Sequence, residues 1–136
     1  MKFYICPSFS KQKSYYSLFT SFLLLFLSIN FIYYKKGPEL LQFLLCLVGI
    51  FSVIHHSRSF SDEYNDFICI LDRIFANLLG IYILFLYQNN RTFGIIIFIS
   101  FLFVFIQNKC QSPKNQSFLH SFIHILVCMI LILNHP

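Results

Sequence analysis

Long uninterrupted apolar runs are the feature of this sequence that most constrains its fold. Five runs are long enough to cross the roughly 30 Å hydrocarbon core of a bilayer as helices, and they lie at residues 17–34, 39–56, 67–87, 92–107 and 117–133. Each run is apolar all round rather than alternating every second residue, which favours helices over the strands of a membrane barrel. The sequence therefore predicts an all-α integral membrane protein, a bundle of about five transmembrane helices.

The composition supports this class and argues against two others. Hydrophobic residues make up 57% of the 136 residues and charged residues only 11%, whereas a soluble domain carries about 25% charge. A disordered chain lacks apolar and aromatic residues, but this one contains 19 Phe and 8 Tyr. The net charge of +5 forms no basic stripe with spaced aromatic residues, so no nucleic acid partner is expected. Residues 1–136 are expected to form a single transmembrane domain.

Basic residues between the runs predict the orientation, because they concentrate on the cytosolic side of a membrane. Six lie on the side of the N-terminus and three on the other: Lys2, Lys11, Lys13, Arg58, Lys109 and Lys114 against Lys35, Lys36 and Arg91. This predicts a cytosolic N-terminus and an external or lumenal C-terminus, in a membrane that the sequence does not specify. A signal peptide is the alternative for the first run, but its length and the lack of a small-residue cleavage site favour a retained span.

Polar residues inside three of the runs are the candidate functional residues. An ionisable group in hydrocarbon costs on the order of 3 kcal/mol by insertion scales, so such a group needs a partner. The second run ends with Ser52 and His56, the third contains Asp72, and the fifth begins with His120 and His124. Because successive spans alternate in direction, all five side chains should lie at one level of one leaflet.

The histidine spacing indicates a metal site. His120 and His124 are four residues apart, so their imidazoles point the same way, as do the two histidines of HExxH zinc sites. Together with His56 and a water molecule they would complete a tetrahedral zinc ion, the pattern of catalytic zinc sites. Asp72 would compensate the charge of the ion, and Ser52 shares a helix face with His56. We therefore predict zinc bound by three histidines.

Simpler interpretations of the same residues remain open. Two histidines at this spacing also arise by chance, and in a membrane span they can serve only to hydrogen-bond a neighbouring helix. His55 is about 100° around the helix from His56 and is not expected to be a ligand. His135 lies at the other end of the last span and is left out of the site.

The combination resembles the signature of the CREST superfamily, which contains alkaline ceramidases, progestin and adipoQ receptors, hemolysin III proteins and related membrane hydrolases. The sequence Ser52-Val53-Ile54-His55-His56 is similar to its first motif, Leu71-Asp72 to its second, and residues 120–127 (HSFIHILV) to its last. The resemblance implies that His56, His120 and His124 bind zinc, and that Asp72 and Ser52 surround the metal-bound water.

The chain differs from that superfamily in the number of spans. The superfamily has seven spans, with its motifs in the second, third and seventh, whereas the last motif here lies in the fifth. The loss of two spans preserves the side on which the motifs meet, but fewer helices remain to enclose a lipid cavity. A homo-oligomer could restore the missing wall.

These observations predict a zinc-dependent intramembrane hydrolase that cleaves a lipid amide or ester. Zinc would activate water, Asp72 would accept its proton, and Ser52 would donate to the oxyanion or hold the water. A ceramide-like membrane lipid is the substrate that the resemblance implies. The alternative is a non-enzymatic multi-pass membrane protein, receptor-like or structural, whose histidines bind zinc structurally or only join helices.

Overall fold

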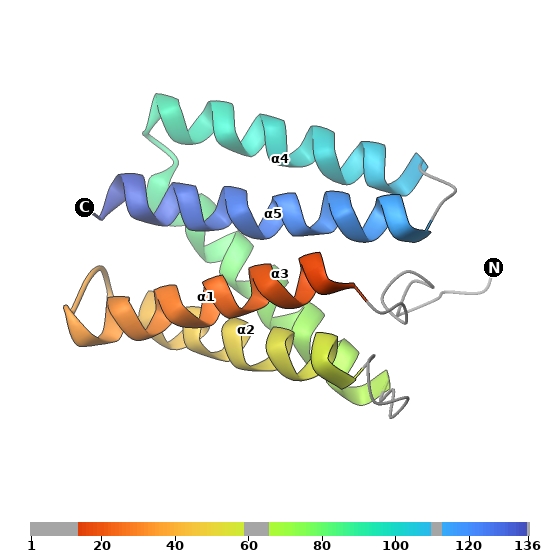
Figure 1. Ribbon diagram of the computed structural model, residues 1–136. Coiled ribbons are helices and arrows are strands. Elements are labelled where there is room, and N and C mark those ends of the chain that lie inside the picture. Colours follow the sequence, from red (N-terminus) through yellow and green to blue (C-terminus); the bar gives the residue numbers. More distant parts are fainter. Residues whose placement is uncertain (1–13, 59–65, 110–112, 136) are drawn as a thin grey trace.

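Five α-helices make up the fold, as the computed structural model shows for residues 14–58, 66–109 and 113–135 (Figure 1). They are α1 (Tyr15–Tyr33), α2 (Glu39–Arg58), α3 (Asp66–Tyr87), α4 (Arg91–Lys109) and α5 (Pro113–Asn134), and the described residues contain no strand. The predicted all-helical class is confirmed. Helices α1, α2, α3 and α5 are long and apolar enough to cross a bilayer, and α4 contributes the shorter apolar stretch Arg91–Ser100. These helices are those of a multi-pass membrane protein.

Local signals set the helix ends. The side chain of Ser14 accepts a hydrogen bond from the backbone N–H of Ser17 and caps α1. After α1 the chain turns through Lys35 and Gly37, with φ of 51° and 71°, a backbone region that glycine adopts most readily. The Oδ1 atom of Asn90 accepts from the backbone N–H groups of Thr92 and Phe93, at 3.0 and 3.3 Å, and caps α4. Short polar segments therefore separate the spans.

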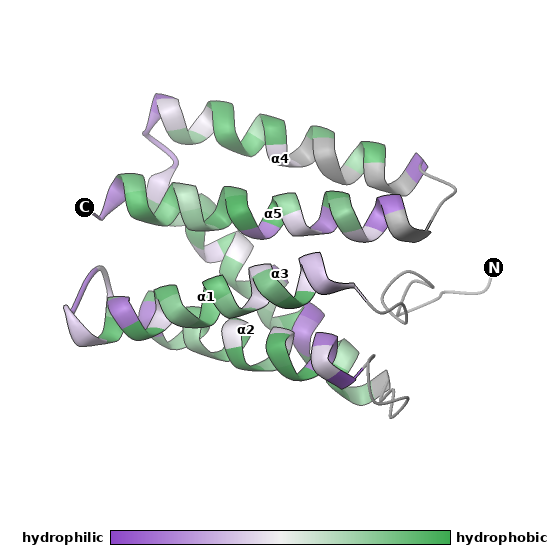
Figure 2. Ribbon diagram, viewed as in Figure 1, coloured by the Kyte–Doolittle hydropathy of each residue, from purple (hydrophilic) through white to green (hydrophobic). Residues whose placement is uncertain are grey.

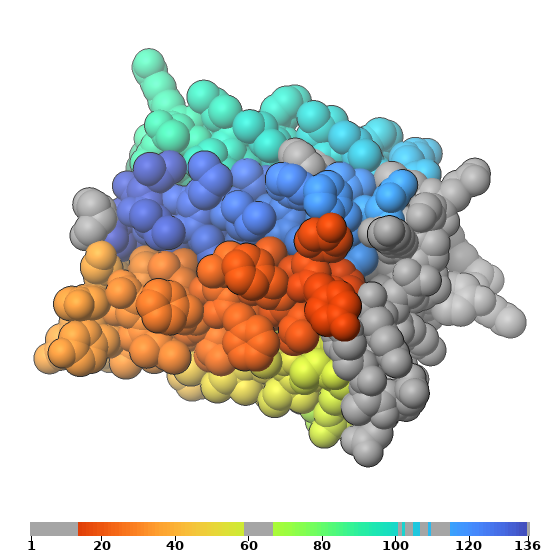
Figure 3. Space-filling view, viewed as in Figure 1, coloured from red at the N-terminus to blue at the C-terminus, as the bar shows by residue number. Residues whose placement is uncertain are grey.

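The helices pack in the order α3, α2, α1, α5, α4, with each helix against the next. Figure 1 shows α5 lying between α1 and α4, with α3 behind α1, and Figure 3 shows the side chains of α1 and α5 in contact along their length. Among the described residues, α3 packs closely against neither α4 nor α5. The series of helices is therefore open along one side, between α3 and α4.

The two chain termini lie at opposite ends of the bundle (Figure 1). The end of α2 and the starts of α3 and α5 lie at the same end as the start of α1. We call this end the histidine end, because it carries His56 and His120. The basic residues Lys2, Lys11 and Lys13, used above to predict the orientation, lie outside the described residues.

Polarity is inverted relative to a soluble protein. Aromatic side chains point outward, and Phe26, Phe85 and Phe98 are each about 70% exposed. Serines are buried instead, and Ser21, Ser28 and Ser52 have no exposed surface. Figure 2 shows the same pattern along the helices, with apolar residues over their length and polar residues toward the ends. An apolar exterior around a partly polar interior is the arrangement that surrounding lipid stabilises.

Helices α1 and α2 approach each other closely at Gly49. A Cβ atom placed on Gly49 of α2 would lie only 2.8 Å from the Cα atom of Leu25 in α1. Small residues let helix backbones approach closely in a membrane, where van der Waals packing provides much of the attraction. Leu24, Leu41 and Leu45 fill the same interface and are at most 1% exposed. This tight pair forms the base on which the histidine end is built.

A second set of contacts lies at the end of the bundle opposite the histidine end. His135 hydrogen-bonds the hydroxyl group of Tyr87 and packs edge-on against Phe31. Its partial burial and the nearby ammonium of Lys36 lower the pKa of His135.

Of the described cysteines, Cys46 and Cys128 are free thiols and Cys69 is disulfide-bonded.

Candidate metal centre

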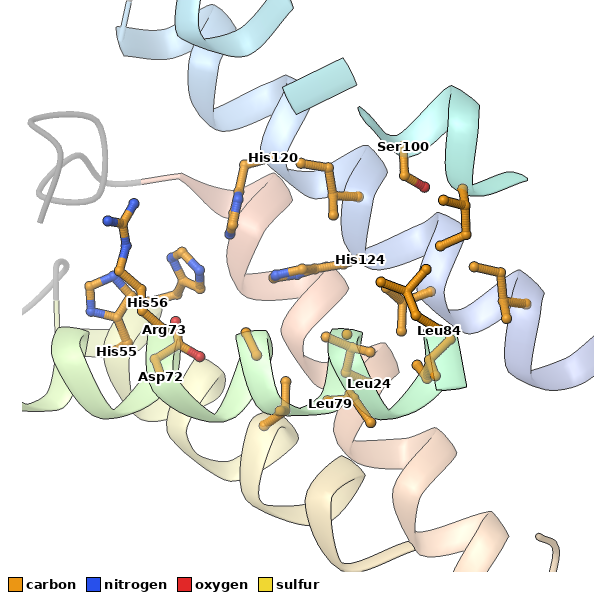
Figure 4. A pocket seen from close by; sticks show the side chains of 18 of the residues that line it. Leu24, His55, His56, Asp72, Arg73, Leu79, Leu84, Ser100, His120 and His124 are labelled. Atoms are coloured by element: carbon orange, nitrogen blue, oxygen red, sulfur yellow. The ribbon is translucent and has the colours of Figure 1, made fainter. Parts of the chain in front are cut away.

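Three imidazoles meet at the histidine end. His56 lies in the last turn of α2, His120 lies in the first half of α5, and His124 lies one turn further along, near the middle of α5. Their potential ligand nitrogens all lie within 4.8 Å of one another. The ring centroids are 5.8 Å apart for His56 and His120, 6.1 Å for His56 and His124, and 4.6 Å for His120 and His124. Figure 4 shows the labelled rings gathered at one end of a cavity.

The donor set fits a zinc ion. A tetrahedral zinc with Zn–N bonds of 2.0–2.1 Å places its ligand nitrogens about 3.4 Å apart. The observed upper limit of 4.8 Å leaves a gap that small side-chain rotations can close. His56 is 4% and His124 9% exposed, and the buried Nε2 atom of His56 has no hydrogen bond in the described part of the chain, although the ring makes other interactions. His120 is half-buried. Three histidines are the ligands of one class of catalytic zinc site.

A hydroxyl group on α1 orients His124. Thr20 Oγ1 lies 3.1 Å from His124 Nδ1 and also within donor distance of two backbone carbonyls of its own helix, those of Tyr16 and Ser17. A hydroxyl has one proton. If that proton is donated to a carbonyl, Nδ1–H of His124 donates to Thr20, and the lone pair of His124 lies on Nε2. Such outer contacts fix the tautomer of metal-binding histidines.

Asp72 lies next to His56, and a further histidine, His55, lies close to both. Carboxylate and imidazole ligand atoms of Asp72, His55 and His56 lie within 4.8 Å of one another. Asp72 is 8% exposed and His55 3%. The sequence does not predict His55 as a ligand, because His55 is displaced around α2 from His56. Both are nevertheless buried, because α2 is covered by α1 on one side and by α3 on another.

Ser52 lies away from the cavity. Its hydroxyl oxygen is 2.8 Å from Ser21 Oγ, and Ser21 in turn donates to the Ser17 carbonyl at 2.6 Å. Since the proton of Ser21 is used there, Ser52 donates to Ser21. Ser52 is absent from the described residues that line the cavity. The structure thus brings Asp72 next to His56, one of the three predicted ligands, and directs Ser52 toward α1.

Hydroxyl groups of α1 hold the site together, and sequence reasoning missed them. Ser17 Oγ lies 2.9 Å from Ser117 Oγ and 3.4 Å from Ser121 Oγ on α5. Thr20 reaches His124, and Ser21 reaches Ser52 on α2. The signal was present as small hydroxyl residues at 17, 20, 21 and 28, because spacings of three (17 to 20), four (17 to 21) and seven (21 to 28) place them on one helix face. Helix α1 therefore ties α2 and α5 together beneath the imidazoles.

A cavity of about 270 Å³ extends from the histidines between α3 and α5. Most of its polar groups gather at the histidine end, where Figure 4 shows His55, His56, Asp72, Arg73 and His120, whereas Ser100 lies apart from them on α4. Aliphatic side chains of all five helices form most of the remaining wall, among them Leu24, Val48, Leu79, Ile97 and Ile130. Ala76, Gly80 and Leu84 line the cavity and are also exposed. The cavity thus reaches the lipid-facing surface along α3.

No family model matches this chain, and no match was found among curated proteins or solved structures. The candidate site therefore stands on its own geometry.

Proposed function

We propose that this protein is a zinc-dependent hydrolase of a lipid amide or ester, acting at the histidine end of the bundle. One observation carries the proposal: three imidazoles from two helices, two of them buried and that of His120 half-buried, converge beside a buried carboxylate at the polar end of an apolar cavity. Apolar pockets with a few convergent polar groups suit ligands of this kind. Resemblance of the short motifs to the CREST superfamily supports a ceramide-like substrate.

The residues have distinct parts in the proposed chemistry. His56, His120 and His124 would hold the zinc ion, which supplies Lewis-acid activation of water and of a carbonyl group. Asp72, adjacent to His56, would accept the proton of the attacking water and pass it to the leaving group. Ser52 is left out of this mechanism because its hydroxyl donates to Ser21.

Substrate placement follows from the shape of the cavity. A lipid whose amide or ester lies at the histidines can place its acyl chain among Leu79, Ile83 and Val127, which line the apolar part. The open side along α3 gives such a chain a path from the bilayer. Substrate therefore needs no passage through water, which suits a lipid that does not leave the membrane.

Zinc content is the first test. Purified protein, analysed by inductively coupled plasma mass spectrometry, should carry one zinc per chain, and His124→Ala should lose it. Ser28→Ala is the matched control, because Ser28 Oγ donates only within its own helix, and it should retain zinc. A zinc-free wild-type protein, in a preparation to which added zinc does not bind, would contradict the proposal.

Hydrolysis is the second test. Fluorescently labelled ceramides and related lipid amides and esters would be presented to the protein in vesicles, and release of fatty acid would be measured. We expect turnover that falls at least 100-fold in Asp72→Asn while the zinc content stays near one per chain. Zinc without turnover on any lipid offered would favour a non-enzymatic role.

That alternative has one specific observation in its favour. His124 already has a hydrogen-bond partner on another helix, Thr20, which is how a histidine that only joins helices would behave. A stable protein without zinc, in which His124→Ala lowers thermal stability, would identify the histidines as structural.

A further inference from the structure

A polar side chain faces lipid at mid-depth on α3. Asn77 is ten residues from each end of the span Phe67–Tyr87, or about 15 Å at 1.5 Å per residue. Its side chain is exposed, and it makes no hydrogen bond among the described residues. At this depth there is no water and no headgroup, so an unsatisfied amide costs several kcal/mol. Asn77 is too short to reach the interface.

Its surroundings are shaped for close contact with another helix. Ala76 and Gly80 lie beside Asn77 and are exposed, and a Cβ atom placed on Gly80 would meet nothing within 4 Å. Small residues next to a polar one let a second helix approach until interhelical hydrogen bonds form. Among the described residues no other helix packs closely on this face, since α3 contacts mainly α2.

The same face borders the cavity. Ala76, Gly80 and Leu84 line it and are exposed, so a helix seated on Asn77 would also cover the opening. Beyond Asn77, toward the end of α3 away from Arg73, the lipid-facing side is apolar, with Ile81 64% and Phe85 69% exposed. The occupant must therefore be an apolar membrane helix that offers a hydrogen-bond donor and acceptor at mid-depth.

We propose that α3 of a second copy of this chain occupies this face, giving a two-fold dimer in which the two Asn77 amides hydrogen-bond each other. A carboxamide both donates and accepts, so Asn77 complements itself across a two-fold axis, as an isologous interface requires. The dimer covers the open side of the cavity with residues of the partner. This inference holds whether or not the cavity belongs to a hydrolase.

Energy transfer between two labelled copies tests the proposal. Donor- and acceptor-tagged full-length protein would be reconstituted in phosphatidylcholine vesicles over a range of protein-to-lipid ratios, with untagged protein as competitor. We expect saturable transfer that the competitor abolishes. Asn77→Leu should weaken dimerisation by about tenfold, since each membrane hydrogen bond contributes on the order of 1 kcal/mol, and Asn77→Gln should retain most of it.

Two further variants separate a lost interface from a lost fold. Gly80→Leu adds bulk where the monomer is open, so it should keep monomer stability and abolish energy transfer. Ile29→Val changes an exposed residue on α1, outside the proposed interface, and should match the wild type. Monomeric wild-type protein at all ratios, or undiminished transfer in both Asn77→Leu and Gly80→Leu, would overturn the proposal and point to a different partner.

Discussion

One hydroxyl group determines which nitrogen of His124 is available to a metal. Thr20 reaches His124 from α1, a helix that carries none of the three proposed ligands. With Nδ1 occupied by Thr20, Nε2 keeps its lone pair for the ion. Residues that orient a ligand in this way commonly contribute 10–100-fold to metal affinity. Thr20 is therefore a positioning residue of the proposed zinc site.

Replacing this hydroxyl by a methyl group tests that role. We expect Thr20→Val, which nearly preserves the shape of the side chain, to weaken zinc binding by about 10–100-fold, as measured by competition with a chelator of known affinity. Thr20→Ser restores a hydroxyl and should recover most of the affinity. Equal affinity of wild type and Thr20→Val would show that His124 is oriented by its packing alone, without affecting the zinc proposal itself.

The identity and spacing of residues predicted part of the candidate site. The directions and burial of its other side chains depend on packing between helices. The spacing of His120 and His124, with the alternation of the spans, was enough to predict that they would lie near His56. The direction in which the Ser52 hydroxyl points was not predictable, because it depends on a hydrogen bond to Ser21 of a different helix. His55 was missed for the same reason, since its burial depends on α1 and α3 covering two sides of α2. Side-chain direction follows from neighbours that one sequence does not display.

At the scale of elements, apolar runs predicted the helices but missed the first turn of α5. The fifth run was placed at 117–133, whereas α5 is Pro113–Asn134 and includes a polar turn. Proline is favoured at the first position of a helix because its missing N–H is not needed there. The fourth run, 92–107, extends to Arg91–Lys109 in α4. Runs of apolar residues mark the part of a helix that lies in lipid, and the caps lie outside it.

The α1–α2 pair offers a test of helix packing. Gly49→Ala adds a methyl group where backbone atoms of Leu25 already lie within about 3 Å, so it should destabilise the protein by about 1–3 kcal/mol. Thermal unfolding can be followed with a dye that reacts with the free thiols of Cys46 and Cys128.

Gly94→Ala is the matched control for this change. A Cβ atom on Gly94 of α4 would meet nothing within 4 Å, so this variant should be as stable as the wild type. Destabilisation of similar size in both variants would mean that helix packing at Gly49 is not the cause.

At the scale of the whole molecule, the bundle gathers its polar groups at one end and leaves one side open. The odd number of helices places the termini at opposite ends (Figure 1), and the histidines lie at the N-terminal end. Among the described residues, the cavity lies between α3 and α5, and no helix packs across the gap between α3 and α4. If the proposed function is right, lipid would enter such a cavity from the side, whichever way the protein is inserted.

The orientation of the bundle determines which leaflet would supply lipid to the proposed site. Basic residues favour a cytosolic histidine end. One observation favours the reverse: Cys69, near the start of α3, is disulfide-bonded, and disulfides persist mainly in oxidising compartments. We propose the orientation that the charges favour.

Epitope tags at the two termini, probed with protease on intact and on permeabilised membranes, distinguish the two orientations. With the histidine end in the cytosol, the N-terminal tag should be accessible from the cytosolic side, and the C-terminal tag only from the other. An odd number of spans places the two tags on opposite sides of the membrane, so each tag serves as a control for the other. If both tags were accessible from one side, five crossings would be contradicted. An N-terminal tag on the external or lumenal side would instead place Cys69 where a disulfide is stable and would direct the search for substrates to that leaflet.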